Sequence, residues 1–120
     1  MRAADVYRHQ QRSFASDQSA IPTLFSELVQ TVAAARAAIM ESRLEDAHAS
    51  LTLAQQVLAG LRAGLSPEPK ELVDNLRSLY QHCELLLIRA NMQKSVEDID
   101  QAMQVLSTLR DAWQEAALQV

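Results

Sequence analysis

The stretch that decides the fold is LVDNLRSLYQHCELLLIRA, residues 72–90, in which apolar side chains recur at steps of four and three. An α-helix turns once in about 3.6 residues, so this spacing aligns them along one side of a helix, as in the seam of a helical bundle. We predict a helix that starts after Pro69 and ends around Asn91 to Lys94. Its seam consists of Leu72, Leu76, Leu79, Cys83, Leu86 and Ala90.

Three other stretches show the same spacing. Ser19 can cap a helix that has Pro22 in its first turn and ends at about Ser42. Another helix begins near Leu44 and ends at Gly64, before the turn residues 66–69. The predicted seams are Ile21, Phe25, Leu28, Val32, Ala35 and Ile39 in the first of these helices, and Leu44, Ala47, Leu51, Ala54, Leu58 and Leu61 in the second.

The last predicted helix starts after Ser95, which forms a capping-box-like pair with Asp98 three residues later. It continues to about residue 118, and Trp113 is expected to anchor the core there, with its indole N–H bonded to a partner or to solvent. The seam of this helix is Ile99, Ala102, Leu106, Leu109, Trp113 and Ala116.

The composition favours long helices. Hydrophobic residues make up 48% of the 120 residues, whereas the chain has two glycines, three prolines and 4% aromatic residues. Turn residues and β-branched runs are too few for a sheet. Short connections make successive helices antiparallel. We predict an all-α protein, an antiparallel up-down-up-down four-helix bundle over residues 19–118, with a flexible N-terminal arm over residues 1–18.

The charge, the single cysteine and the distribution of apolar residues limit the kinds of partner and the cellular location that we expect. The formal charge is −4, and the basic residues are scattered, so nucleic acid is not an expected partner. The single cysteine, Cys83, cannot form an intrachain disulfide, and no stretch resembles a signal peptide or a membrane-spanning helix. We expect a cytoplasmic protein that does not insert into a membrane.

Several apolar residues lie outside the seams. They are Leu53 and Val57 in the second helix, and Val73, Tyr80, Leu85, Leu87 and Ile88 in the third. A central helix contacted by two neighbours buries more than its seam, which explains one apolar flank. The functional interpretation is a groove that accepts an amphipathic or extended segment of a partner.

Candidate catalytic and metal-binding groups are few. Glu45 and His48 have the spacing found in di-iron bundles, and His82 could accept a phosphoryl group in a phosphotransfer bundle. Each lacks the companion residues that such sites need, and Cys83 is expected to pack as a small apolar group in the seam. Phosphate-binding loops and serine nucleophile motifs are absent from the sequence. We expect no enzyme activity, catalytic residue, metal or cofactor.

Five sequence elements together resemble a known family. In chain order they are an N-terminal tyrosine, the stretch 35–39, Asn75-Leu76-Arg77-Ser78-Leu79-Tyr80, Ala90-Asn91 and Leu109-Arg110-Asp111-Ala112-Trp113. This arrangement, from Tyr7 to Ala116, resembles the FliS-type flagellar export chaperones. The chain departs from the family pattern at Leu24-Phe25-Ser26-Glu27, where Leu-Tyr-Asp-Gly is common, and at Pro67 and Pro69, which replace a glycine.

The resemblance implies a four-helix bundle that binds the disordered C-terminal segment of flagellin in the cytosol. Binding would prevent premature polymerisation and assist delivery to the flagellar type III export apparatus, where other export proteins are possible partners. It also implies that an N-terminal arm covers part of the binding surface when no client is bound, with Tyr7 and Phe14 as the covering side chains.

For the client groove we select five of the surplus apolar residues. They are Leu53, Val57, Tyr80, Leu87 and Ile88. Two alternative hypotheses remain: a structural or regulatory bundle that self-associates through the same faces, and a phosphotransfer or metal-binding bundle that uses His82 or His48.

Overall fold

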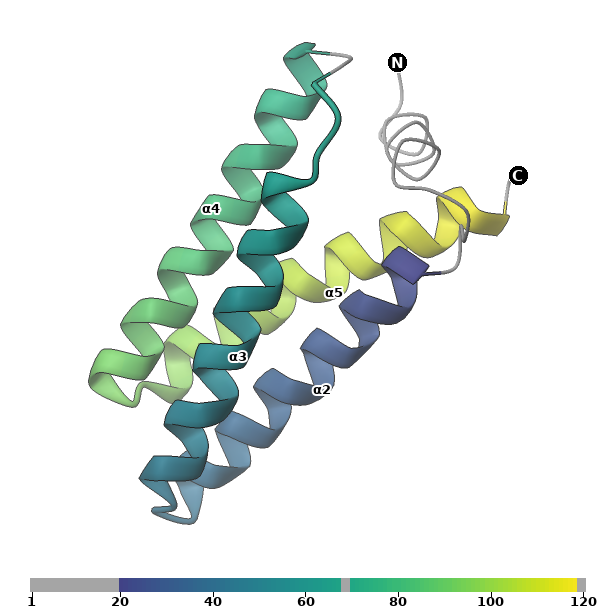
Figure 1. Cartoon of the computed structure of the whole chain (residues 1–120). Helices are drawn as coiled ribbons and strands as arrows, with labels where there is room; N and C mark the ends of the chain where they lie inside the picture. Colours follow the sequence, from purple (N-terminus) through teal and green to yellow (C-terminus); the bar gives the residue numbers. More distant parts are fainter. Residues whose placement is uncertain (1–19, 68–69, 119–120) are drawn as a thin grey trace.

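The part of the chain that the structure describes forms four long helices (Figure 1). The computed structural model describes residues 20–67 and 70–118, without the side chains of Leu72 and of residues 116–118. The helices are α2 (Ala20–Met40), α3 (Leu44–Ala63), α4 (Lys70–Gln93) and α5 (Val96–Leu118). Each lies within about two residues of its predicted bounds. The predicted arm over residues 1–18 lies outside the described residues.

The helices form an antiparallel ring in chain order. Each packs against the next, and α5 returns to pack against α2. The predicted up-down-up-down four-helix bundle is therefore confirmed. No helix in the described part of the chain is long and apolar enough to span a membrane.

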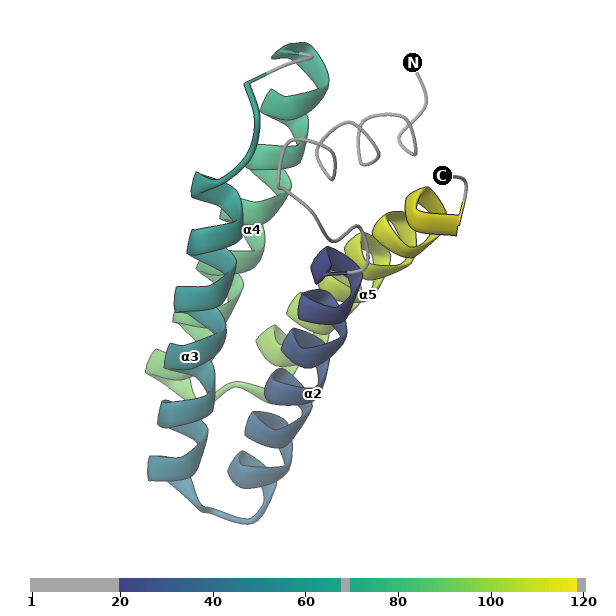
Figure 2. The ribbon, with the colours of Figure 1, turned by 45° about the vertical axis from the view of Figure 1, so that its right-hand side comes forward.

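The bundle is tapered. The α3–α4 pair and the α2–α5 pair lie close together near the α2–α3 and α4–α5 loops and diverge toward the opposite end (Figures 1 and 2). Small side chains fill the core near those loops, and larger ones fill it at the opposite end, so the interhelical spacing grows along the axis. The small residues are Ala35, Ala38, Ala47, Ala90 and Ala102, and the large ones include Phe25, Leu58, Leu61, Leu65, Leu76, Tyr80 and Trp113.

An aromatic cluster joins three helices at the wide end. Phe25 of α2 stacks on Trp113 of α5, with ring centroids 6.5 Å apart, and contacts Tyr80 of α4 at 5.9 Å. The Trp113 indole N–H donates a hydrogen bond to the Tyr80 hydroxyl over 3.2 Å. All three side chains are buried. The expectation that Trp113 anchors the core and bonds its N–H is confirmed.

Replacing Tyr80 with phenylalanine removes the acceptor of the Trp113 N–H while keeping the ring. We expect Tyr80→Phe to lower the free energy of unfolding by about 1 kcal/mol, the net value of one buried hydrogen bond. Urea unfolding measures this difference. A Trp113→Phe background serves as the control, because the same substitution should cost less there; equal costs in both backgrounds would show that the two groups are not coupled.

The seam prediction holds in α2, α3 and α5 with small deviations and needs correction in α4. Leu79 is 44% exposed, whereas Tyr80, the next residue along, is 1% exposed. One residue turns a helix by about 100°, so the core side of α4 is rotated from the predicted seam. Among the described side chains of α4, the core residues are Val73, Leu76, Tyr80, Cys83, Leu86, Leu87 and Ala90. Elsewhere, Leu44 is exposed and Ile39 is half-buried.

Two loops reverse the chain through non-glycine residues with a left-handed backbone. Ser42 has φ 59° and Lys94 has φ 50°. After α2, the N–H of Arg43 bonds to the carbonyl of Ala38, and that of Ser42 bonds to Ile39, which is a Schellman motif. The helix α3 ends at Gly64 as predicted, and Gly64 has φ −84°, which is not a left-handed backbone.

A glycine at position 42 should stabilise the fold. A left-handed backbone costs a non-glycine residue roughly 1–2 kcal/mol, and glycine avoids this cost at a smaller entropic penalty in the unfolded chain. We expect Ser42→Gly to raise the free energy of unfolding by about 0.5 kcal/mol in urea titrations. Ser42→Ala keeps the backbone cost and is the control; an equal gain in that variant would show that the backbone is not responsible.

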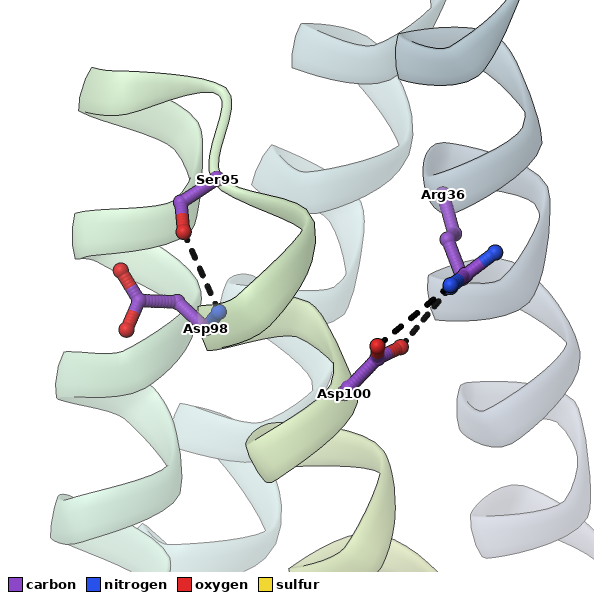
Figure 3. Close-up of polar contacts among 4 residues, drawn as sticks. All are labelled: Arg36, Ser95, Asp98 and Asp100. Carbon is purple, nitrogen blue, oxygen red and sulfur yellow. Dashed lines mark hydrogen bonds and ion pairs between the residues drawn. The ribbon is translucent and has the colours of Figure 1, made fainter.

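Polar contacts fasten the start of α5. The Asp98 N–H donates to the Ser95 hydroxyl over 3.2 Å, which confirms the predicted cap (Figure 3). The Asp98 carboxylate accepts a hydrogen bond from Arg89 of α4 at 2.9 Å rather than closing the capping box. This bond to Arg89 lowers the pKa of Asp98 below its ordinary value. Between the neighbouring helices α2 and α5, Arg36 of α2 binds Asp100 of α5 at 2.8 Å (Figure 3).

Candidate partner-binding site

The surplus apolar residues separate into a buried and an exposed group. Val73, Tyr80 and Leu87 belong to the core, which corrects the expectation that Tyr80 and Leu87 line a client groove. Both lie on the side of α4 that faces the bundle interior, because α4 packs against α3 and α5 at once. Leu53, Leu85 and Ile88 are exposed, as expected for at least one surplus face, and Val57 is half-buried.

A small groove lies between α2 and α3. It encloses about 200 Å³, and Leu53 and Val57 of α3 line it opposite Leu24 of α2. Leu53 is 52% exposed at its rim, whereas Val57 and Leu24 pack partly against the core. The remaining lining residues are Glu27, Leu28, Thr31 and Ala54. Leu53 and Val57, which the sequence analysis selected for the client groove, both line this groove.

Ile88 lies on a different surface. One flank of α3 faces α4. On this flank Arg62 binds Glu84 of α4 at 2.6 Å, and His48 lies 3.2 Å from Asn91 of α4. The opposite flank of α3 holds Val57 and the α2–α3 groove. Ile88 therefore does not join Leu53 and Val57. It shares an exposed apolar strip of α4 with Leu85 and Met92, at helical spacings of three and four residues.

A larger groove lies along α5. It encloses about 680 Å³ and includes Leu79, the exposed residue that the sequence assigned to the core. From α5 the apolar residues Met103 and Val105 contribute, and both are only partly buried. The signal in the sequence is that Met103 and Val105 are apolar but lie outside the α5 seam. The other lining residues are Asp100, Gln104, Ser107, Thr108, Leu109 and Asp111.

The candidate catalytic and metal-binding side chains either have structural contacts or lie apart from one another. Cys83 is buried, its Sγ lies 3.8 Å from the carbonyl of Ala102, and burial raises its pKa to about 12. His48 contacts Asn91, and His82 lies on the exposed side of α4. Among the residues that the structure describes, no three histidine, cysteine, aspartate or glutamate side chains are grouped to hold a metal. Tyr7 and Phe14 lie outside this part of the chain.

The Cys83 thiol should be inert in the folded protein. A pKa raised from 9.0 to about 12 leaves almost no thiolate at pH 8, and burial excludes the reagent. We expect an aromatic disulfide reagent to label Cys83 only after unfolding in urea, at a rate set by the opening of the bundle. Fast labelling of the folded chain would contradict the buried position. The unfolded state ionises first, so stability should also fall as the pH rises above 9.0 toward 12.

A helical bundle with apolar residues exposed along two grooves has the features of a protein-binding bundle. The family model of the flagellar protein FliS matches residues 1–120, so the chain belongs to the FliS family. It is also 28% identical over 106 residues to the flagellar secretion chaperone FliS of Escherichia coli (strain K12), covering 87% of this chain and 78% of that protein. The family and this relative assign the chain to the flagellar export chaperones.

Proposed function

We propose that the chain holds the C-terminal segment of flagellin in the cytoplasm, prevents its premature polymerisation and assists its delivery to the flagellar type III export apparatus. The observation that carries this proposal is the groove between α2 and α3, with Leu53 exposed over Val57 and Leu24. The E. coli relative is a flagellar secretion chaperone, which supports a role in export.

The groove suits reversible binding of an amphipathic segment. A leucine at its rim exposes apolar surface that a client side chain can cover, and each fully covered aliphatic side chain contributes about 1.5–3 kcal/mol. The groove is small, and a disordered client must also become ordered on binding, which lowers the net affinity. A chaperone that later releases its client benefits from this balance.

The α4 strip of Leu85, Ile88 and Met92 offers a second contact region for a long client. These side chains are exposed on one helix and continue for about two turns. We propose that Ile88, the one exposed member of the predicted set on α4, contacts the client where the segment extends beyond the α2–α3 groove. In this proposal Tyr80 and Leu87 support the helix from inside and do not touch the client.

Calorimetric titration of the full chain with the C-terminal peptide of flagellin from the same source tests the proposal. We expect saturable one-to-one binding with a negative heat-capacity change, because apolar surface becomes buried. Leu53→Asp should weaken binding at least about tenfold, as expected for the loss of one apolar anchor.

Gln56→Asp is the matched control, because it adds the same charge to an exposed position of α3 that lies outside the groove. Circular dichroism checks that both variants keep their helices. Equal affinities of the two variants would show that the α2–α3 groove does not hold the client. A concentration-dependent dimer without peptide binding would instead favour the self-associating bundle.

A further inference from the structure

Gly60 interrupts α3 with a residue that helices disfavour. It is exposed, and its carbonyl accepts a hydrogen bond from the N–H of Gly64 at 3.1 Å, so the helix continues regularly through it. Its φ is not positive, and an alanine could therefore adopt the same backbone. A glycine within a helix lowers stability relative to alanine, because it loses more backbone freedom on folding. The backbone conformation therefore does not account for Gly60.

Packing within the described part of the chain does not account for this glycine either. A Cβ atom placed at position 60 would lie in open space, with no neighbouring side chain or other helix within 4 Å. An alanine would fit there without displacing any described atom, and it would favour the helix. A glycine is commonly found where another backbone approaches closely, and no described residue makes such an approach to Gly60.

Gly60 lies on the flank of α3 that carries the α2–α3 groove. It follows Val57 by three residues and Leu53 by seven, and these spacings place all three on one side of the helix. A rise of roughly 10 Å separates Leu53 from Gly60. The exposed residues of this flank are Ala49, Leu53, Gln56 and Gly60, and none of them is charged. The α3 side of the groove therefore continues as an uncharged surface to Gly60.

We propose that Gly60 is the point at which the backbone of the client approaches α3 most closely. This inference rests on the proposed function, and the occupant is a helical stretch of the flagellin segment. One large apolar side chain of that stretch enters the groove between Leu24, Leu53 and Val57. A small residue, such as glycine, alanine or serine, lies one or two turns away on the same face of the client helix and packs on Gly60.

The dimensions of the site agree with this occupant. The groove encloses about 200 Å³. A cavity of about 150 Å³ can hold a benzene ring, so the groove has room for one large apolar side chain. Helix axes usually lie about 8–10 Å apart, and small residues at the crossing point allow a closer approach. The α2 and α3 helices diverge toward the end of α3 that holds Gly60 (Figure 2), which leaves this flank open to a client.

Gly60→Ala and Gly60→Leu in the full chain test this proposal, with the C-terminal flagellin peptide as the calorimetric probe. We expect Gly60→Ala to raise the urea midpoint of unfolding, because alanine favours the helix. The same variant should bind the peptide at least about fivefold more weakly, because the added methyl group holds the two backbones apart. Gly60→Leu should weaken binding at least about tenfold.

Gln101→Leu is the control for added bulk, because it places a leucine at an exposed position of α5 outside both grooves. It should leave the peptide affinity unchanged, and equal weakening by this variant would overturn the proposal. A lower urea midpoint for Gly60→Ala would also overturn it, because the glycine would then serve the fold. The alanine variant decides the matter if Gly60→Leu does not fold.

The same titrations separate this proposal from the proposed function. If the unmodified chain binds the peptide and Leu53→Asp weakens binding, unchanged or higher affinity of the Gly60 variants would overturn only the role of Gly60. Absence of peptide binding by the unmodified chain would overturn both proposals. Higher stability together with weaker binding in Gly60→Ala is the combination that supports a close approach of the client at this position.

Discussion

The graded size of the core side chains is the constraint on which the rest of the structure depends. Alanines near the α2–α3 and α4–α5 loops let the two helix pairs approach, and the Phe25–Tyr80–Trp113 cluster holds them apart at the other end. Large side chains there leave flanks such as that of Leu79 outside the core. The same packing that shapes the bundle therefore leaves apolar residues exposed along its grooves.

Much of the fold could be predicted because three helices allow a single register. In α2, α3 and α5 the apolar residues repeat at three and four positions with few competitors, and their seams are largely correct. In α4, two registers satisfy the same spacing and share Leu76, Cys83, Leu86 and Ala90. Whether Leu79 or Tyr80 faces the core depends on where α3 and α5 pack against α4. The sequence of α4 alone does not contain this information. The left-handed residues Ser42 and Lys94 likewise give no local signal.

The candidate site was predicted in part. Leu53 and Val57 were placed together because both lie outside a seam whose register is clear, and the structure sets them on one groove. Tyr80 and Leu87 were misplaced by the ambiguity of α4. The groove along α5 escaped prediction because it requires Leu79 to be outside the core.

The start of α2 and the end of α5 lie at the same wide end of the bundle, and the two helices are antiparallel neighbours (Figures 1 and 2). This placement determines how the molecule responds to mechanical force. A pull applied between residues 20 and 118 loads the α2–α5 contacts one turn after another, as in unzipping, rather than all together, as in shear. The bundle should therefore open at low force from its wide end, and the alanine-packed end should be the last to separate.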